Sequence, residues 1–316
     1  GRPVDPSSTV LRRNAQGMGA ACGRTLPFVH GRCCCCPYGE PCFRVVSWNV
    51  LSPRQQNWPA RRPELLARLA EVEADIVALQ EALPRSSSDS LHSGMARLGY
   101  SAHHCDPDVD GIEPPVLYVR RSAFRVTWED AHQRTVAACL EPVAFRGPPV
   151  HILNVHLMAA PGEGVARVYQ VRKALRRVAA QATSGQGTLC PDVPLLLVGD
   201  FNELAGEGLL HPLLTRGAPP SGGDVPGGKA EWASCRFTDV HLAALGSFAP
   251  TTWPCPKPHA RIDYIFSTES LFCTGVPTPL APEEADYPSD HLLIGADFRL
   301  ALGDSESEAA SSGEEG

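Results

Sequence analysis

Short apolar segments recur along the chain, and polar residues follow most of them directly. Pro194–Val198 is an unbroken apolar run, which is typical of a strand buried on both faces. Gly199 then allows a sharp turn, so that Asp200 and Asn202 would be presented at the edge of a sheet. Segments of this kind predict strands at residues 44–51, 75–79, 116–119, 136–143, 150–157, 194–198, 261–266 and 291–300.

Three segments carry apolar residues at helical spacing instead. The first, residues 63–74, begins with Pro63, which suits the first turn of a helix. The second, residues 91–99, ends at Gly99, which suits the position after a helix C-terminus. Residues 165–180 predict a longer amphipathic helix, with apolar residues on one face.

The opposite face of that longer helix is basic, because it carries Arg172, Lys173, Arg176 and Arg177. Such a face would contact a nucleic-acid backbone, or it is an ordinary solvated surface.

Helices occur between some of the predicted strands, but several strands follow one another directly. This order favours a two-sheet α/β sandwich over a doubly wound sheet. At 316 residues, one large domain at 43–301 is expected, with a disordered or targeting segment at 1–42 and an acidic disordered tail at 302–316. The Gly- and Pro-rich residues 217–230 predict a flexible surface loop.

The charge balance limits the kinds of partner. The chain has 28 Lys and Arg against 35 Asp and Glu, for a formal net charge of -7, and five of the acids lie after residue 303. This argues against binding long nucleic acid by bulk charge, but a nucleotide or polyphosphate substrate is allowed if cations in the site neutralise it. No apolar run approaches the roughly 20 residues of a membrane-spanning helix, so no transmembrane segment is expected.

Twelve cysteines are present, and four of them are contiguous at Cys33–Cys36. Adjacent cysteines make a poor disulfide scaffold, so the pattern favours a reducing intracellular compartment, with the cytoplasm expected and the mitochondrion or nucleus as alternatives. The basic residues 12–32 would suit the remnant of a transit peptide. The cysteine cluster would suit palmitoylation or metal binding, or it is an accident of composition.

Polar side chains stand at the ends of the predicted strands, where an apolar strand has no structural need for them. The set comprises Asn49, Glu81, Asn154, His156, Asp200, Asn202, Asp263, Asp290 and His291. Taken singly, each has an ordinary explanation. Asp200 and Asn202 are common turn residues, and Glu81 would suit a helix start. His156 would be a core histidine, and Asp263 would pair with Arg261.

Taken together, these residues supply carboxylates, imidazoles and amides, without a cysteine nucleophile or a Gly-rich phosphate loop. Carboxylate and amide oxygens suit Mg²⁺ or Mn²⁺, whereas a zinc site would favour His and Cys in closer spacing.

The order of these motifs resembles the endonuclease/exonuclease/phosphatase superfamily over residues 43 to 300. The motifs are Trp48-Asn49, Gln80-Glu81, Asn154–Leu157, Gly199–Asn202, Arg261–Tyr264 and Ser289–His291. The resemblance implies a four-layer α/β sandwich of the DNase I-like type, with two mostly antiparallel sheets flanked by helices. It also implies metal-dependent hydrolysis of a phosphate ester.

The same resemblance implies a role for each matched residue. Glu81 would be the principal Mg²⁺ or Mn²⁺ ligand, with Asn49 and Asp290 beside it. The residue that positions or deprotonates the attacking water would be Asp200.

The remaining matched residues would act on the phosphate. Asn202 would hold the water or a phosphoryl oxygen. His291, oriented by Asp263, would contact the phosphate or serve as base, and His156 would donate to a non-bridging oxygen.

Four motifs look most like the nocturnin and deadenylase branch, namely Trp48–Leu51, Arg167 with Gln170, Thr251–Trp253 and Tyr287–His291. This likeness implies a 3′–5′ exoribonuclease or a nucleotide 2′-phosphatase, with RNA expected rather than DNA, and a monomer is expected. Substrate contacts would come from Asn154, Arg261 and Trp253. Trp253, Tyr100 and Trp58 would stack on bases or else belong to the core.

Three alternatives stay open. The chain also has features in common with tyrosyl-DNA phosphodiesterase, and the superfamily includes endonucleases and sphingomyelinases. A protein that keeps the sandwich and only binds its ligand is the third alternative, although each catalytic position holds a competent residue.

Overall fold

The computed structural model describes residues 42–55, 57–83, 90–104, 113, 115–132, 134–182, 193–219, 224–246, 250–277 and 287–300. The Cys33–Cys36 cluster, the proposed transit remnant and the acidic tail lie outside these residues. Within the described residues no helix is both long enough and apolar enough to cross a membrane.

Two six-stranded sheets form the centre of the molecule. The first sheet contains, in spatial order, β11 (Leu271–Gly275), β12 (Ile294–Leu300), β1 (Cys42–Asn49), β2 (Ile76–Gln80), β4 (Val116–Arg120) and β3 (Tyr100–His104). The second sheet contains β5 (Phe124–His132), β6 (Thr135–Pro142), β7 (Val150–His156), β8 (Leu195–Asp200), β10 (Asp263–Ser267) and β9 (Thr238–Asp239). Between the described strands, β1–β2 and β7–β8 pair in parallel and the other pairs are antiparallel.

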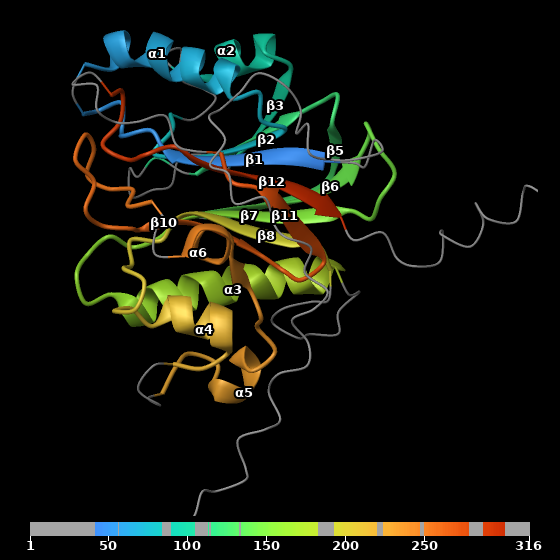
Figure 1. The fold of residues 1–316 in the computed structure, drawn as a ribbon, viewed down its shortest axis with the longest axis vertical. Helices are drawn as coiled ribbons and strands as arrows, with labels where there is room; N and C mark the ends of the chain where they lie inside the picture. The colour runs from blue at the N-terminus through green and yellow to red at the C-terminus, as the bar shows by residue number, and fades with distance from the viewer. Residues whose placement is uncertain are drawn as a thin grey trace, which may run out of the picture.

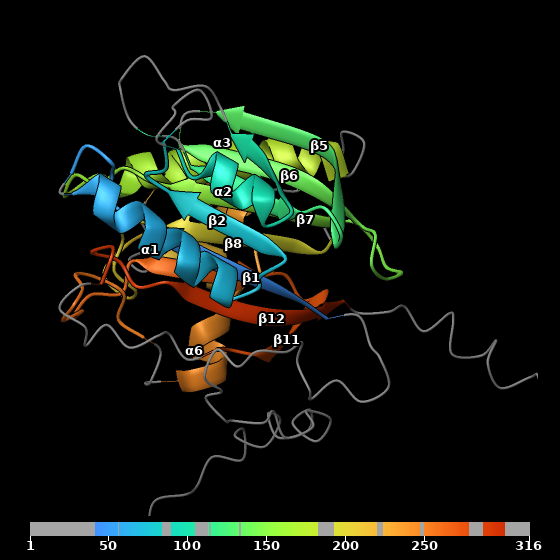
Figure 2. The same ribbon diagram turned by 90° about the horizontal axis from the view of Figure 1, so that it is seen from above.

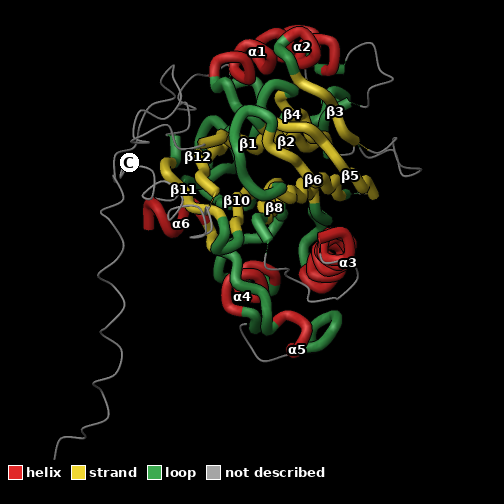
Figure 3. Tube along the Cα trace, turned by 90° about the vertical axis from the view of Figure 1, so that its right-hand side faces the viewer, coloured by secondary structure: helices red, strands yellow, loops and turns green. Residues whose placement is uncertain are grey.

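Helices cover both outer faces of the paired sheets, which makes four layers (Figure 1). The helices are α1 (Trp58–Glu71), α2 (His92–Arg97), α3 (Gly164–Ala182), α4 (Leu210–Arg216), α5 (Lys229–Trp232) and α6 (Val240–Leu245). Figure 2 shows α1 and α2 lying across the first sheet, and Figure 3 shows α3 and α4 beneath the second. The prediction of two mostly antiparallel sheets flanked by helices is confirmed.

Strand β8 shows why the longest apolar run is a central strand. Leu196 and Val198 belong to the hydrophobic core between the two sheets. Leu195 and Leu197 point the other way, into the core beneath α3 and α4. Because alternate side chains of a strand face opposite sides, a strand covered on both faces needs an apolar residue at every position.

Gly199 has a different function from the predicted turn, because it lies inside β8. Its φ is +134°, and a Cβ atom there would meet the Val155 carbonyl oxygen of β7 at 2.0 Å. We expect Gly199→Ala to lower the free energy of unfolding by about 3 kcal/mol, since the backbone of a neighbouring strand cannot move aside. Urea unfolding measures this loss.

The matched control is Gly206→Ala. Gly206 also has a positive φ, of +88°, but no heavy atom lies within 4 Å of an added Cβ. Its cost should be only about 1 kcal/mol, from backbone strain alone. Equal losses in the two variants would contradict the close-approach explanation.

Several predicted boundaries and elements were wrong. Helix α1 begins at Trp58, so Pro63 lies inside the helix, and Pro59 occupies the first turn. In the predicted surface loop at 217–230, Val225 is buried in the core and Lys229 begins α5. The sequence pattern did not predict strands β3, β5, β9 and β11 or the short helices α4 to α6.

The cysteines within the described residues do not all support the predicted reducing compartment. Cys42 and Cys235 take part in disulfides, whereas Cys139, Cys255 and Cys273 are free thiols. The argument from cysteine usage is therefore weakened, and the compartment stays a prediction.

Candidate active site

The polar residues at the strand ends meet at one edge of the two sheets. Asn49 ends β1, and Glu81 follows the parallel neighbour β2. His156 and Asp200 lie side by side at the ends of the parallel strands β7 and β8. Strand β10 runs antiparallel to β8 and begins with Asp263 opposite Asp200. Strand topology alone therefore brings side chains from five strands together.

Asn49 bridges two carboxylates across the gap between the sheets. Its amide nitrogen donates to Glu81 Oε1 and to Asp200 Oδ2, each at 3.0 Å. The backbone N–H of Ser52 donates to the other Glu81 oxygen at 2.7 Å. Burial raises the pKa of Glu81, but the charge that His156 carries when it is protonated and the hydrogen bonds from Asn49 and Ser52 outweigh burial, so that this pKa lies below its ordinary value. Glu81 is therefore an ionised acid at neutral pH.

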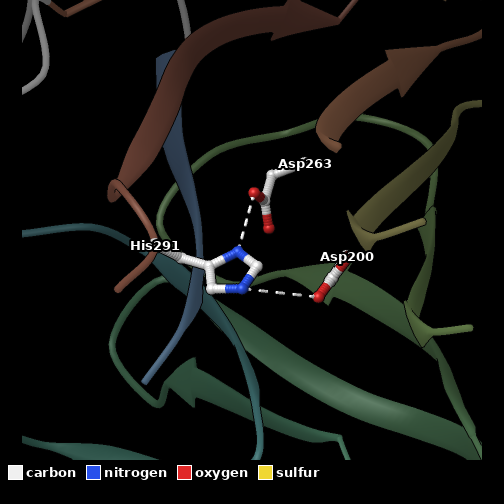
Figure 4. A group of neighbouring side chains, drawn as sticks. All are labelled: Asp200, Asp263 and His291. Carbon is white, nitrogen blue, oxygen red and sulfur yellow. Dashed lines mark hydrogen bonds and ion pairs between the residues drawn. The ribbon is translucent and has the colours of Figure 1, made fainter. Parts of the chain in front are cut away.

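His291 lies between two carboxylates (Figure 4). Its Nδ1 is 3.0 Å from Asp263 Oδ2, and its Nε2 is 3.8 Å from Asp200 Oδ2. One ligand atom from each of these three buried residues lies within 4.8 Å of the others. The hydrogen bond to Asp263 fixes the ring so that Nε2 faces Asp200 and the pocket.

This cluster shifts the protonation of its members. Burial alone lowers the pKa of His291, but Asp263, by its charge and hydrogen bond, together with the charges of Asp200 and Asp290, raises it to about 10. Burial and then the charge of Asp263 raise the pKa of Asp200, and His291, His156 and Asn49 offset this only in part. Asp200 is thus a buried carboxylate that a further cation would stabilise.

His156 faces the same two acids from β7. Its Nε2 is 3.7 Å from Glu81 Oε1 and 3.8 Å from Asp200 Oδ2. Burial lowers the pKa of His156 despite these neighbouring carboxylates, so the ring is neutral at neutral pH. Its Nδ1 is buried and has no hydrogen-bond partner within the described residues.

Asp290 is held by the hairpin that precedes β10. The indole N–H of Trp253 donates to Asp290 Oδ2 at 3.2 Å. The backbone of the hairpin is joined to the same segment, because Cys255 N–H donates to the Asp290 carbonyl at 2.7 Å and Leu292 N–H donates to the Thr252 carbonyl at 2.8 Å. The other carboxyl oxygen, Asp290 Oδ1, is buried without a hydrogen-bond partner within the described residues.

A pocket of about 500 Å³ opens at this edge of the sheets. Its lining comprises Glu81, His156, Ala159, Pro161, Arg167, Asp200, Asn202, Leu204, Trp253, Ala260, Ile262, Asp290 and His291. Carboxylates and imidazoles from segments far apart in the sequence therefore converge on one cavity. A pocket of this size accommodates a small ligand, on the order of one nucleotide.

Comparison with known proteins agrees with this geometry. The model of the endonuclease/exonuclease/phosphatase family matches residues 46–291, which is most of the chain. The chain belongs to this family. The sequence resemblance to this family is thereby confirmed.

Individual relatives lie in the branch that the sequence predicts. Human 2′,5′-phosphodiesterase 12 is 21% identical over 311 residues, or 81% of this chain and 48% of that protein. The structure of ANGEL2, described as a 2′,3′-cyclic phosphatase, aligns with a TM-score of 0.69 at 18% identity and covers 84% of this chain and 97% of that one. The structure of the human nocturnin catalytic domain aligns with a TM-score of 0.61 at 22% identity. This alignment covers 83% of this chain and 95% of the nocturnin domain.

The chain is shorter than its curated relatives. It spans between about a third and about half of the length of the angel and phosphodiesterase 12 proteins. The structural alignments, all below 25% identity, establish the fold that this family member shares with them.

The donor set of this family member fits a divalent cation. Glu81, Asp200 and Asp290 bring three carboxylates to one pocket, and one oxygen of Asp290 is buried without a partner within the described residues. Buried anionic oxygens need a counter-charge, and carboxylates are hard ligands of the kind that Mg²⁺ and Mn²⁺ prefer. The residues present therefore suit such an ion better than a zinc ion.

Two predicted substrate-binding residues do not face the pocket. Asn154 is 0% exposed, and its amide donates to the carbonyls of Leu79 and Val116 while its oxygen accepts from Gln80. With every polar atom of its side chain engaged, Asn154 ties the two sheets together. The predicted substrate contact of Asn154 is wrong.

Arg261 is the second correction. Its guanidinium forms two hydrogen bonds to Asp239, at 2.9 and 2.5 Å, and lies over the ring of Tyr264. The predicted substrate contact is wrong, and so is the alternative pairing with Asp263, which binds His291 instead.

Asn49, which was predicted as a metal ligand, has both polar atoms of its side chain engaged within the protein. The residue is buried, and its side-chain oxygen accepts a hydrogen bond from the Leu51 N–H at 3.1 Å. Its side-chain nitrogen donates to Glu81 and Asp200. Its position is that of a bridge that orients Glu81 and Asp200. Trp253 and Asn202 do line the pocket, as predicted.

The other proposed contacts prove structural. Tyr100 and Trp58 are buried core residues rather than exposed stacking platforms. On the basic face of α3, Arg172 and Arg176 both bind Glu231, and Arg177 binds Asp130. Three of the four basic side chains are thus engaged in ion pairs within the protein, so the solvated-surface interpretation is favoured over nucleic-acid binding.

Three supporting residues were missed by the sequence analysis. Thr252 Oγ1 accepts from the N–H groups of Ile262 and Asp263, and Ser289 Oγ donates to the Asn49 carbonyl. Thr252 lies inside the Thr251–Trp253 motif and Ser289 inside the Ser289–His291 motif. Their proximity in sequence to the predicted site residues is therefore a signal that could have identified them.

No sequence signal identifies Arg61, because it lies in helix α1 and outside the motifs, where an arginine is usually a surface residue. Its guanidinium donates to the carbonyls of Val50, Leu51, Ser52 and Pro288. It thereby ties the segment after β1 to the segment that carries Asp290.

Proposed function

We propose that this chain is a Mg²⁺-dependent phosphoesterase that cleaves RNA from its 3′ end, as a nocturnin- and deadenylase-like exoribonuclease. The observation that carries the proposal is the convergence of Glu81, Asp200 and His291 on one pocket. When bound by Glu81 and Asp290, Mg²⁺ or Mn²⁺ would supply the positive charge that phosphoryl oxygens need during hydrolysis.

Asp200 is proposed to orient and deprotonate the attacking water. The raised pKa of Asp200 makes it a better proton acceptor than an exposed aspartate. The backbone N–H of Asn202 donates a hydrogen bond to Asp200 Oδ1 at 2.9 Å. In the reaction the water oxygen bonds to phosphorus, the P–O bond to the leaving sugar breaks, and the leaving oxygen takes up a proton. The Asn202 side chain is proposed to hold the water or a phosphoryl oxygen.

The two histidines are proposed to stabilise the charge that develops on the phosphoryl oxygens. His291 is positively charged at neutral pH and, with Nδ1 bound to Asp263, directs Nε2 into the pocket. His156 is neutral and would donate from Nε2 to a non-bridging oxygen. Donors fixed in advance at such positions are a major source of rate enhancement.

RNA is proposed as the substrate because relatives in this branch are named for phosphoesters of ribonucleotides, namely a 2′,5′-phosphodiesterase and a 2′,3′-cyclic phosphatase. A monomeric state belongs to the same proposal. A nucleotide 2′-phosphatase would use the same catalytic groups, so experiment must separate the two.

The test is a panel of four substrates: an RNA with a 3′-oligo(A) end, NADPH, a 5′-tyrosyl DNA and sphingomyelin. We expect release of AMP from the RNA, abolished by EDTA and restored by Mg²⁺. If the folded protein releases product from none of them, the hydrolase proposal fails and a binding protein is favoured. Preferential cleavage of another substrate would overturn the choice of RNA.

Trp253 should influence metal binding through Asp290. Trp253→Phe keeps an aromatic ring but loses the N–H that donates to Asp290 Oδ2. One lost hydrogen bond to a carboxylate, at about 1 kcal/mol, should raise the Mg²⁺ concentration for half-maximal activity about 5-fold. Initial rates over a range of Mg²⁺ concentrations and calorimetric titration with Mn²⁺ measure the change.

Tyr169→Phe is the control for that variant, because Tyr169 is an exposed aromatic on α3 outside the pocket lining. It should leave both titrations unchanged. An unchanged metal titration in Trp253→Phe would show that the indole does not hold Asp290.

A further inference from the structure

The lining of the pocket carries more negative than positive charge. Three carboxylates line it, from Glu81, Asp200 and Asp290. Apart from the histidines, Arg167 is the one cationic side chain among the described residues that form the lining. One divalent cation and the charged His291 would be enough to accompany these acids and a single phosphoryl group.

Arg167 is committed to the protein itself. It is 8% exposed, and its Nη1 donates to the carbonyl oxygens of Met158 at 2.7 Å and Ala160 at 3.3 Å. Its Nε lies 3.7 Å from the buried carboxylate of Glu203. Because Nη1 is engaged and Nε is buried, Arg167 shapes the wall of the pocket and has no pair of N–H groups free for a two-pronged grip on a second phosphate.

The segments between β1 and β12 that lie outside the described residues contain few basic residues in their sequences. They comprise residues 56, 84–89, 105–112, 114, 133, 183–192, 220–223, 247–249 and 278–286. Their sequences contain a single basic residue, Arg85, and no lysine. The predicted cation Arg261 is bound to Asp239 and does not line the pocket.

The rest of the pocket wall is apolar. It comprises Ala159, Pro161, Leu204, Trp253, Ala260 and Ile262. Trp253 is 37% exposed, and its backbone is fixed by hydrogen bonds in both directions with Ala260, at 3.0 and 2.8 Å. A rigid, partly exposed indole beside small apolar residues is suited to the flat face of a nucleobase.

We infer that the pocket takes one nucleotide unit with a single phosphoryl group, the scissile one, and selects against nucleotides that carry a second phosphate on the same unit. This inference rests on the proposed function and names its substrate class. An additional phosphate would bring negative charge into a low-dielectric pocket with three carboxylates, and the described residues of its lining include no guanidinium that is free to bind it. The dinucleotide ApA is thus a substrate, whereas its 3′-phosphorylated form ApAp and the polyphosphorylated NADPH are poor ones.

The first test compares substrates that differ by one phosphate. We expect kcat/KM for ApA to exceed that for ApAp and that for NADPH by at least 30-fold. Calorimetric binding of the products, which does not depend on turnover, should favour AMP over adenosine 3′,5′-bisphosphate by at least 10-fold. Equal or tighter binding of the bisphosphate, or equal turnover of ApA and ApAp, would overturn the inference.

The second test adds a cation to the apolar wall. Leu204 is 37% exposed at the pocket, and Leu242 is 44% exposed on α6, outside the pocket lining. Leu204→Arg should narrow the preference for ApA over ApAp at least 5-fold, whereas Leu242→Arg should leave it unchanged. Thermal unfolding of both variants checks the fold, and a preference that Leu204→Arg leaves unaltered would contradict the charge argument.

The two proposals can fail separately. If no substrate is hydrolysed, the proposed function fails, and the product-binding comparison still decides whether a single phosphate is preferred. If ApAp or NADPH is hydrolysed as well as ApA, the hydrolase proposal survives and the single-phosphate inference is wrong.

Discussion

Asp200→Asn is expected to lower kcat by about 10³-fold, while leaving KM within a few-fold of the unaltered protein. The amide has the same shape as the carboxylate and can still accept the hydrogen bond from Asn49, but it cannot take a proton from water. The effect should therefore fall on the chemical step rather than on binding. Initial rates on an oligo(A) RNA at saturating Mg²⁺ measure it.

The same variant should be more stable than the unaltered protein in the absence of metal. Burial and the nearby charge of Asp263 raise the pKa of Asp200, which means that folding disfavours its ionised form. A neutral amide removes this unfavourable charge. Urea unfolding in EDTA should show the gain, and it should diminish in Mg²⁺, which stabilises the carboxylate.

A gain in stability with a loss of activity would mark Asp200 as a residue retained for function at the expense of the fold. An inactive variant that is also unfolded would instead show that the carboxylate is structural. An active variant would remove Asp200 from the mechanism.

The predictability of the strands depended on how fully each is buried. β8 is covered on both faces, so every position is apolar and the segment stands out from its neighbours. β5 lies at the edge of its sheet, and its alternation of less and more exposed positions is broken by a β-bulge between Val126 and Trp128. Phe124 and Val126 pack in the core between the two sheets, whereas Trp128 packs in the core that includes α3. A simple period of two therefore does not continue along the whole strand, and the segment does not stand out in the sequence.

Short helices were beyond the reach of local patterns. α4, α5 and α6 have seven, four and six residues, too few for periodicity to stand out or for a helix to be stable alone. Carboxylates that precede two of them cap their first turns. In α4, the Leu210 and His211 N–H groups donate to Glu203, and in α6 the Leu242 N–H donates to Asp239.

The sequence predicted the site residues that lie at the ends of strands. Asn154 and His156 lie on the same face of β7, and the sequence identifies that face correctly. Asn154 is two residues further from the edge, about 7 Å deeper, where both sheets enclose it. The pattern therefore gives the direction of a side chain but not its depth, and the pairing of Arg261 with Asp239 has no local pattern at all.

Two site residues also adopt a backbone conformation that sequence patterns do not reveal. Glu81 has a φ of 58° and Asn202 has a φ of 48°, in the left-handed region that non-glycine residues rarely occupy. Glu81 follows directly after β2, and the conformation turns its carboxylate toward Asn49 and Ser52. Such conformations persist where surrounding contacts hold them, and they cluster at functional sites.

Asp263→Asn is expected to lower kcat by about 10³-fold with the fold intact. Asp263 accepts the hydrogen bond from His291 Nδ1 and stabilises the charged imidazole. An asparagine can present its amide nitrogen to that position, which favours a different tautomer or ring orientation, and in serine proteases the equivalent change costs about 10⁴-fold. Steady-state kinetics should show the loss in kcat, since Asp263 does not line the pocket and KM should change little.

A second acid–imidazole pair in the same protein supplies the control. His211 Nε2 lies 3.0 Å from Asp239 Oδ2, outside the pocket lining. His211→Gln removes an imidazole from such a pair without touching the site, so it should reduce stability modestly and leave kcat unchanged. If the two variants lose activity equally, the loss reflects the fold; if Asp263→Asn stays fully active, His291 needs no orienting partner and the proposed role of the Asp263–His291 pair is wrong.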